Sequence, residues 1–202
     1  MTQLVHSAHT GSHPVLVTDD GPLRCLNFGT GERQSCVDLR TPWVLQLAYT
    51  RWMMSALLLP QTLRRLLLLG LGGGGMVHFL HRHLPHVRLD VVERERLIID
   101  LARRYFLLPA ADTLHLFRQD AVAFLETPDA CGYQVALVDI FTPGAMAAPV
   151  FEPAFHRALL DRLDADGVLA VNLWSGDRPS FDRALAALEE AHFEPAAKTA
   201  LV

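Results

Sequence analysis

Residues 66–75 constrain the fold more than any other stretch, because four leucines there are followed by five glycines among six residues. A run of four leucines has the length and apolarity of a β-strand buried on both faces. The glycines do not serve packing; they allow positive φ angles and close backbone approach, at a cost in chain entropy. Residues 76–84 then have the pattern of a helix. The stretch therefore predicts the strand, glycine turn and helix that present free backbone N–H groups to a nucleotide.

The spacing of the glycines fits two nucleotide-binding loops. Gly70, Gly72 and Gly75 match G-x-G-x-x-G, and Gly70, Gly72 and Gly74 match the G-x-G-x-G loop of adenosylmethionine-binding folds. Either motif alone is weak, and a tight turn without a ligand explains the same glycines. The glycines are cofactor-binding candidates that need support from the rest of the chain.

The strand predicted next ends in an acidic residue. A strand is predicted at 87–92, and Glu93 follows it, 23 residues after Gly70. A carboxylate only accepts hydrogen bonds, so at the tip of this strand it suits the two hydroxyls of a ribose. The alternative is a solvated glutamate within the charged run 93–96. We favour the ribose role because the spacing is the one that a βαβ unit requires.

Length and composition indicate one full domain with room for a small appendage, because the chain has 202 residues and half of them are hydrophobic. A net charge of −4 argues against a sequence-independent nucleic-acid binder, which needs a basic face.

The start of the chain has no basic region followed by a long apolar stretch, so no signal peptide is expected. No apolar run reaches the roughly 18 residues that a membrane span needs. Cys25, Cys36 and Cys131 have no C-x-x-C spacing, and a reduced, cytoplasmic setting is the simpler interpretation.

The first forty residues predict a small β unit. Residues 1–13 are expected to be a loose tail, 15–18 and 23–28 a hairpin with an Asp-Gly turn, and 34–39 a further short strand. Thr41 and Pro42 are typical of a helix start, and the helix is expected to run from 42 to 59. We therefore divide the chain into a tail and β unit at 1–40 and a Rossmann-like nucleotide-binding domain at 41–202.

From residue 65 onward, strands and helices alternate. Further strands are predicted at 114–117, 135–138, 168–174 and 193–202, and helices at 95–106, 121–126, 153–163 and 179–191. This alternation predicts an α/β fold with a Rossmann-like, doubly wound, mostly parallel sheet.

Two more acids follow predicted strands, at the edge where ligands of such sheets bind. Asp120 could accept a hydrogen bond from the amine of adenine, with the amide of Ala121 serving the ring; the alternative is a plain helix N-cap. Asp139 could hold or deprotonate an amine, the alternative being a carboxylate that caps its loop. The loop 140–152 could act as a lid.

The histidines at 78, 81, 83 and 86 do not predict a metal site. His78 and His81 share a helix face, but no cysteine or carboxylate joins them at ligand spacing. We expect them on a solvated face and expect no metal.

Taken together, these segments resemble spermidine synthase and its relatives, the polyamine aminopropyltransferases. The resemblance covers roughly residues 14–200 and rests on several short motifs: 66–75, 90–93, 101–106, 119–121, 138–139 with Pro143, 149–151 with Phe155, and 166–169. It implies a class I methyltransferase-like domain preceded by a small β domain. It also implies a dimer or larger oligomer that binds decarboxylated adenosylmethionine and a polyamine.

The resemblance also implies roles for single residues. Glu93 would hold the ribose and Asp120 would bind the adenine, while Asp139 would orient or deprotonate the attacking amine. Gln34 resembles the family's glutamine near the sulfonium, and Tyr49 the tyrosine that borders the polyamine pocket.

Three positions depart from the family pattern, and each loses an acid. Gly73 stands where the glycine loop of the family carries an aspartate, Thr142 replaces the second acid of D-S-x-D-P, and Arg51 replaces an acid after the tyrosine. A polyamine is a polycation that needs several acids. We therefore expect an intact nucleotide site, an altered polyamine site and little ordinary spermidine synthesis.

Three hypotheses on function remain at this point. The first is a group transferase that moves an aminopropyl or a methyl group from decarboxylated S-adenosylmethionine or S-adenosylmethionine to a small amine or other acceptor. The second is a non-catalytic nucleotide-binding or interaction domain, and the third a nicotinamide-dependent oxidoreductase. Asp120 and Asp139 favour a sulfonium nucleotide. The resemblance and the apolar residues of 43–59 predict a homodimer, and no nucleic-acid or membrane partner is expected.

Overall fold

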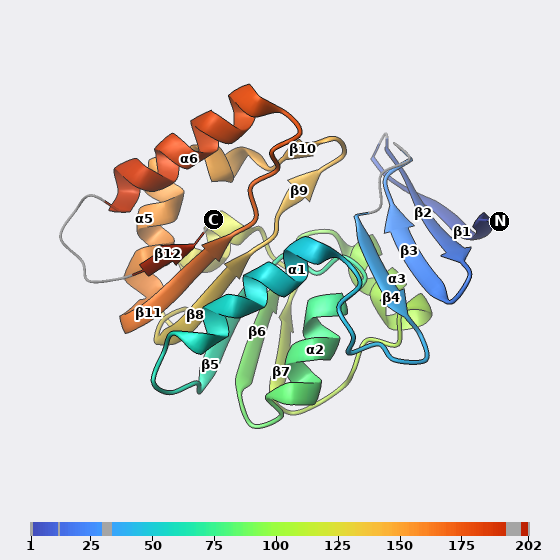
Figure 1. Ribbon diagram of the computed structural model, residues 1–202, viewed down its shortest axis with the longest axis horizontal. Helices are drawn as coiled ribbons and strands as arrows, with labels where there is room; N and C mark the ends of the chain where they lie inside the picture. Colours follow the sequence, from blue (N-terminus) through green and yellow to red (C-terminus); the bar gives the residue numbers. More distant parts are fainter. Residues whose placement is uncertain (1, 12, 30–33, 193–198, 202) are drawn as a thin grey trace.

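The computed structural model describes residues 2–11, 13–29, 34–192 and 199–201 (Figure 1). An antiparallel sheet at the N-terminus lies beside a larger parallel sheet that carries helices on its faces. A short hairpin of β9 (Phe141–Thr142) and β10 (Ala145–Met146) forms a third, two-stranded sheet. No helix in the described ranges is long and apolar enough to cross a lipid bilayer.

The N-terminal sheet has four strands in the order β1-β2-β3-β4. Their bounds are β1 Thr2–Thr10, β2 His13–Asp20, β3 Leu23–Asn27 and β4 Ser35–Asp38. The expected hairpin and short strand are confirmed, but the expected loose tail is wrong because its residues 2–10 form β1. This polar edge strand is held by antiparallel backbone pairing to β2, which a hydrophobic pattern does not reveal.

A disulfide joins the last two strands of this sheet. Cys25 of β3 and Cys36 of β4 are direct cross-strand partners and form the bond, whereas Cys131 is free and exposed. The expectation of three reduced cysteines is therefore wrong for two of them. Their pairing follows from the antiparallel register of β3 and β4, and no short cysteine motif announces it.

The larger sheet has six strands in the order β12-β11-β8-β5-β6-β7, and all five pairs are parallel. The strands are β5 Arg65–Leu69, β6 Arg88–Val92, β7 Leu114–Phe117, β8 Tyr133–Val138, β11 Leu163–Val171 and β12 Thr199–Leu201. The predicted leucine strand is central and pairs with β6 and β8. The sixth predicted strand is confirmed for 199–201; positions 193–198 and 202 lie outside the described residues.

Helices cover both faces of this sheet, so the doubly wound α/β fold is confirmed. On one face Leu66 and Leu68 pack in a core with residues of α2 (Gly75–His83) and α3 (Arg96–Tyr105). On the other face Leu67 and Leu69 pack with residues of α4, α5 and α6. These three helices span Ala121–Leu125, Pro153–Arg162 and Arg178–His192. Short 3₁₀ turns span Met54–Leu58 (η1) and Ala148–Phe151 (η2).

The helix predicted at 42–59 is much shorter, since α1 spans only Ala48–Met53 before η1. Thr41 does not cap it. The amide of Thr41 donates to the carbonyl of Asp38, and the amide of Val44 donates to the carbonyl of Thr41, so this segment forms turns after β4. Asp38 also accepts from the amide of Arg40, which fixes the first turn and prevents the helix from starting at Pro42.

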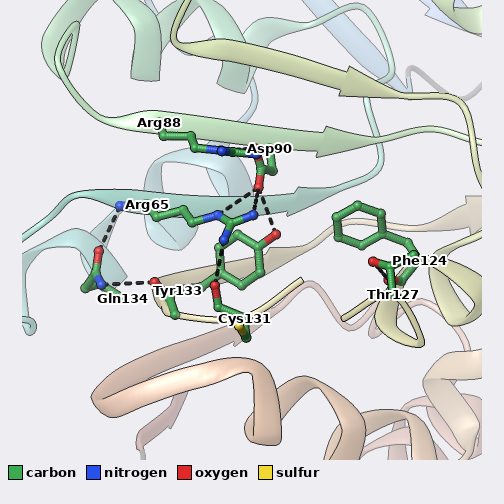
Figure 2. A network of polar contacts seen from close by, with 9 residues as sticks. Arg65, Arg88, Asp90, Phe124, Thr127, Cys131, Tyr133 and Gln134 are labelled. Carbon is green, nitrogen blue, oxygen red and sulfur yellow. Dashed lines mark hydrogen bonds and ion pairs between the residues drawn. The ribbon is translucent and has the colours of Figure 1, made fainter. Parts of the chain in front are cut away.

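A buried polar network holds the amino ends of the parallel strands together, as Figure 2 shows. The Asp90 carboxylate has no exposed surface and accepts from Arg65 Nη2 at 2.7 Å, Arg88 Nε at 2.9 Å and the Tyr133 hydroxyl at 2.9 Å. Burial raises the pKa of Asp90, but these hydrogen bonds outweigh burial and leave the pKa below its usual range. Gln134 accepts from the amides of residues 64 and 65. The negative charge of Asp90 is therefore paired with hydrogen-bond donors at the amino edge of the parallel sheet.

Candidate functional site

A cleft of about 750 Å³ opens at the carboxyl edge of the parallel sheet. Gly70 follows β5, Glu93 follows β6, Asp120 lies beyond β7, and Asp139 follows β8; all four line the cleft. The sequence predicts each of them for this edge, and the structure brings them together. Asn172, which follows β11, also lines the cleft and was not predicted.

The glycine loop leaves no room for a side chain at two of its positions, Gly70 and Gly73. Gly70 has a φ of +98°, and a Cβ there would lie 2.1 Å from the carbonyl oxygen of Asp139. At Gly73 a Cβ would lie 2.9 Å from Cδ1 of Phe106 and 3.1 Å from Oγ of Ser35. Neighbouring segments thus force the glycines at both positions, and an aspartate at 73 could not be accommodated without movement of Phe106. Gly74 caps α2, and Gly72 and Gly75 line the cleft.

Glu93 is fixed against the glycine loop by two backbone amides. Its Oε2 accepts from the amide of Leu71 at 3.3 Å, and its Oε1 accepts from the amide of Glu95 at 2.8 Å. Burial raises the pKa of Glu93, although these two hydrogen bonds oppose the shift. Each carboxylate oxygen keeps a free lone pair, so the group could still accept from two ribose hydroxyls.

Asp120 is the N-cap of α4. Its Oδ1 accepts from the amides of Val122 at 2.9 Å and Ala123 at 3.4 Å. The capping role is thereby confirmed. Asp120 and Ala121 also line the cleft, which is compatible with the predicted adenine contact, and that contact stays a prediction.

Asp139 lies at the centre of a hydrogen-bonded group drawn from three segments. Its Oδ2 accepts from the hydroxyl of Tyr49 on α1 at 3.1 Å, and its Oδ1 accepts from Nδ2 of Asn172 at 2.8 Å. Burial raises the pKa of Asp139, and the two hydrogen bonds counteract part of the shift. Burial and the charge of Asp139 raise the pKa of Tyr49 far above its usual value, so Tyr49 stays protonated and donates.

Gln34 approaches this group through its backbone, since the Tyr49 hydroxyl lies 3.5 Å from the Gln34 carbonyl oxygen. Gln34 and its neighbour Ser35 both line the cleft. The N-terminal sheet therefore supplies one wall of the site.

Asn172 carried the same sequence signal as Asp139, a polar residue directly after an apolar strand. The prediction extended that strand to residue 174, which placed Asn172 inside it. The strand in fact ends at Val171. The backbone N–H of Asn172 donates to the carbonyl of Val138, the residue before Asp139.

The loop predicted at 140–152 contains the β9–β10 hairpin and η2. Thr142 lines the cleft and its Oγ1 donates to the carbonyl of Ala145 at 3.3 Å. Arg51, the third departure, is exposed on α1 and does not line the cleft. Closure of the hairpin as a lid stays a prediction.

The expectation of a solvated face for the histidines is wrong for His78. Its ring is buried, and Nε2 lies 2.7 Å from the carbonyl oxygen of Phe106. Burial lowers the pKa of His78, which keeps the ring neutral in the core. Within the part of the chain that the structure describes, no three metal-ligating side chains come together.

Residues 46–185 match the spermine/spermidine synthase domain family. The chain is 30% identical over 173 residues to the polyamine aminopropyltransferase of Neisseria meningitidis serogroup A; the match covers 85% of this chain and 65% of the relative. The chain thus spans about two thirds of the length of such relatives.

Solved structures share the fold. A spermidine synthase in complex with the transition-state analogue AdoDATO aligns with a TM-score of 0.76 at 16% identity, over 94% of this chain and 65% of that one. Human methyltransferase-like protein 13 in complex with SAH aligns with a TM-score of 0.62 at 25% identity, over 71% and 72% of the two chains.

Proposed function

Because the chain belongs to the spermine/spermidine synthase family, we propose that it is a transferase that moves a carbon group from an adenosyl-sulfonium nucleotide to an amine. One observation carries the proposal. The glycine loop with Glu93 and the carboxylate of Asp139 meet in one cleft at one edge of the sheet. The glycine loop with Glu93 suits a nucleoside, and the carboxylate of Asp139 suits an amine.

The nucleotide half of the cleft would bind through backbone and carboxylate groups. The loop 70–75 offers close backbone approach, Glu93 offers two free acceptor positions to the ribose, and Asp120 with the amide of Ala121 offers contacts to adenine. Gln34 lines the same cleft and would contact the region of the sulfonium. No metal is needed, because the sulfonium is already an activated leaving group.

The transfer itself needs an amine with a free lone pair. That lone pair forms a bond to the carbon attached to sulfur, the C–S bond breaks, and its electron pair stays on sulfur as a neutral thioether. An ammonium with a pKa of about 10 cannot attack, so it must first lose a proton. Asp139 would hold the ammonium and accept that proton directly or through water, while Tyr49 and Asn172 keep its carboxylate in place. Alignment of the reactants supplies most of the rate.

We further propose that ordinary spermidine synthesis is weak, because the second anchor of a diamine is missing. Thr142 lines the acceptor half of the cleft without a charge, and Arg51 is exposed and does not line the cleft. Asp139 alone would hold the reacting nitrogen.

Methyl transfer from S-adenosylmethionine is the second candidate, and Gly73 favours it. An acid in the loop would repel the carboxylate of S-adenosylmethionine and attract the amine of its decarboxylated form. Phe106 and Ser35 crowd the position so that the loop carries no acid there. The similarity to a methyltransferase solved with SAH points the same way.

We also propose that two copies associate through α1 and η1. Trp52 is 78% exposed and Leu58 is 83% exposed, next to Leu59 at 52%. A second copy would cover these three exposed apolar side chains, which lie on one short stretch of the chain.

The proposed function is tested by following product release and nucleotide binding. The protein is incubated with S-adenosylmethionine or its decarboxylated form and a panel of primary amines, and S-adenosylhomocysteine and methylthioadenosine are quantified. The product that forms identifies which group moves. Calorimetry with the same two products measures binding without turnover. If no adenosyl-sulfur compound binds, the proposal is wrong.

A further inference from the structure

We infer that the acceptor for this cleft is a primary monoamine with an apolar body rather than a diamine or polyamine. The inference rests on the proposed function and specifies its acceptor. It follows from how charge is distributed along the edge of the sheet.

Among the described residues that line the cleft, four are carboxylates: Glu93, Glu95, Asp120 and Asp139. The first three follow β6 and β7, which lie on one side of β5 in the sheet. Asp139 follows β8 on the other side of β5, next to β11. The nucleotide half of the cleft thus holds three acids, and the described part of the acceptor half holds Asp139.

Asp139 has room for one ammonium group. Tyr49 donates to one of its oxygens and Asn172 donates to the other. The lone pairs that remain suffice for the nitrogen that reacts. A second ammonium at the far end of a diamine would need another acceptor, and this group does not supply one.

The rest of the described acceptor half is mainly apolar. Its large side chains come from the segment before α1, from the hairpin with the residue before it, and from the segment after β11: Leu47, Ile140, Phe141, Pro143, Leu173 and Trp174. Trp174 is 37% exposed, and its amide donates to the sulfur of Met146, which ties the segment after β11 to the hairpin. These surfaces favour hydrocarbon, and an unpaired cation placed on them loses hydration without compensation.

Putrescine and pentylamine make a matched test, because they have the same chain length and differ by one terminal ammonium in place of a methyl group. The protein is first saturated with methylthioadenosine or S-adenosylhomocysteine, whichever binds, and each amine is then titrated by calorimetry. We expect pentylamine to bind at least tenfold more tightly than putrescine. The measurement does not depend on turnover.

Thr142 provides the matched pair of variants. Thr142→Asp adds an acid to the acceptor half, and Thr142→Asn adds a side chain of similar size without charge. We expect Thr142→Asp to bind putrescine at least tenfold more tightly than Thr142→Asn does, and Thr142→Asn to keep the preference for pentylamine. These variants separate the effect of charge from that of shape.

The outcomes distinguish the two proposals. If the nucleotide products bind but putrescine binds as tightly as pentylamine, or neither amine binds, the inference on the acceptor is wrong while the nucleotide site stands. If no nucleotide product binds, the proposed function fails, and the acceptor inference fails with it.

Discussion

The replacement Glu93→Gln tests the proposed ribose contact most directly. The carboxylate has two oxygens with about four acceptor positions. The amides of Leu71 and Glu95 use two of them, and two remain for the ribose. A glutamine amide keeps one oxygen, carries no charge and turns an N–H₂ group toward donors.

The expected loss follows from this geometry. Losing one charge-assisted hydrogen bond costs about 1.5–3 kcal/mol, which corresponds to an increase of about 10- to 150-fold in the Kd of methylthioadenosine. The replacement also disturbs the amide of Leu71 and hence the glycine loop, so a simple loss of affinity does not prove a ribose contact.

A second ligand separates these two effects. We would titrate wild type and Glu93→Gln with methylthioadenosine and with its 2′,3′-dideoxy analogue. Damage to the loop weakens both ligands equally, whereas a lost ribose contact weakens only the ligand with hydroxyls. The pH dependence gives an independent readout. Burial raises the pKa of Glu93, so affinity should be full above that pKa and fall as the pH is lowered through it, from a higher pH than for an ordinary glutamate. Glu93→Gln should lack this fall.

Equal losses for the two ligands would refute the ribose assignment, and so would an unchanged Kd in the variant. A pH dependence that Glu93→Gln retains would show that another group titrates.

The remaining predictions concern turnover, stability and assembly. Asp139→Asn should lower product release by about 10²–10⁴-fold. Unchanged product release would remove Asp139 from the mechanism. Burial raises the pKa of Asp139, so its negative charge opposes folding once the pH exceeds the pKa that the group has in the unfolded chain. The same variant should therefore not lower the Tm measured by calorimetry at pH 7. Asp90→Asn should lower the free energy of unfolding in urea by about 3–5 kcal/mol, since it leaves the partly buried Arg65 and the buried Tyr133 hydroxyl poorly paired. Arg96→Met breaks an exposed pair and should change it little, and equal losses in the two variants would contradict this account. Trp52→Glu with Leu58→Glu should convert a dimer to the 22.4 kDa monomer in light scattering, whereas a wild type that is monomeric at micromolar concentration rules out the proposed dimer.

The parallel sheet and the carboxylates at its edge could be predicted because both depend on local patterns. Four consecutive leucines favour a strand that is buried on both faces, and parallel strands place the residues that follow them at one edge. Glu93 and Asp139 were identified by that reasoning alone.

The features that the sequence did not reveal depend on contacts between distant segments. The strand Thr2–Thr10 is polar and is held by backbone pairing, and the disulfide follows from the register of two strands. His78 enters the core because the carbonyl of Phe106 satisfies its ring. Asn172 was missed by an error of three residues at the end of one strand, which is enough to hide a residue that holds Asp139.

The two edges of the parallel sheet have different consequences for engineering. The network around Asp90 lies at the amino edge and the cleft lies at the carboxyl edge, with five buried strand residues of β8 between Tyr133 and Asp139. Diversity introduced into the hairpin 141–146 and the segment 173–175 therefore leaves that network, and Asn172 beside Asp139, untouched. A combinatorial library confined to these two segments should retain a high fraction of folded members, and selection could then act on the choice of amine alone.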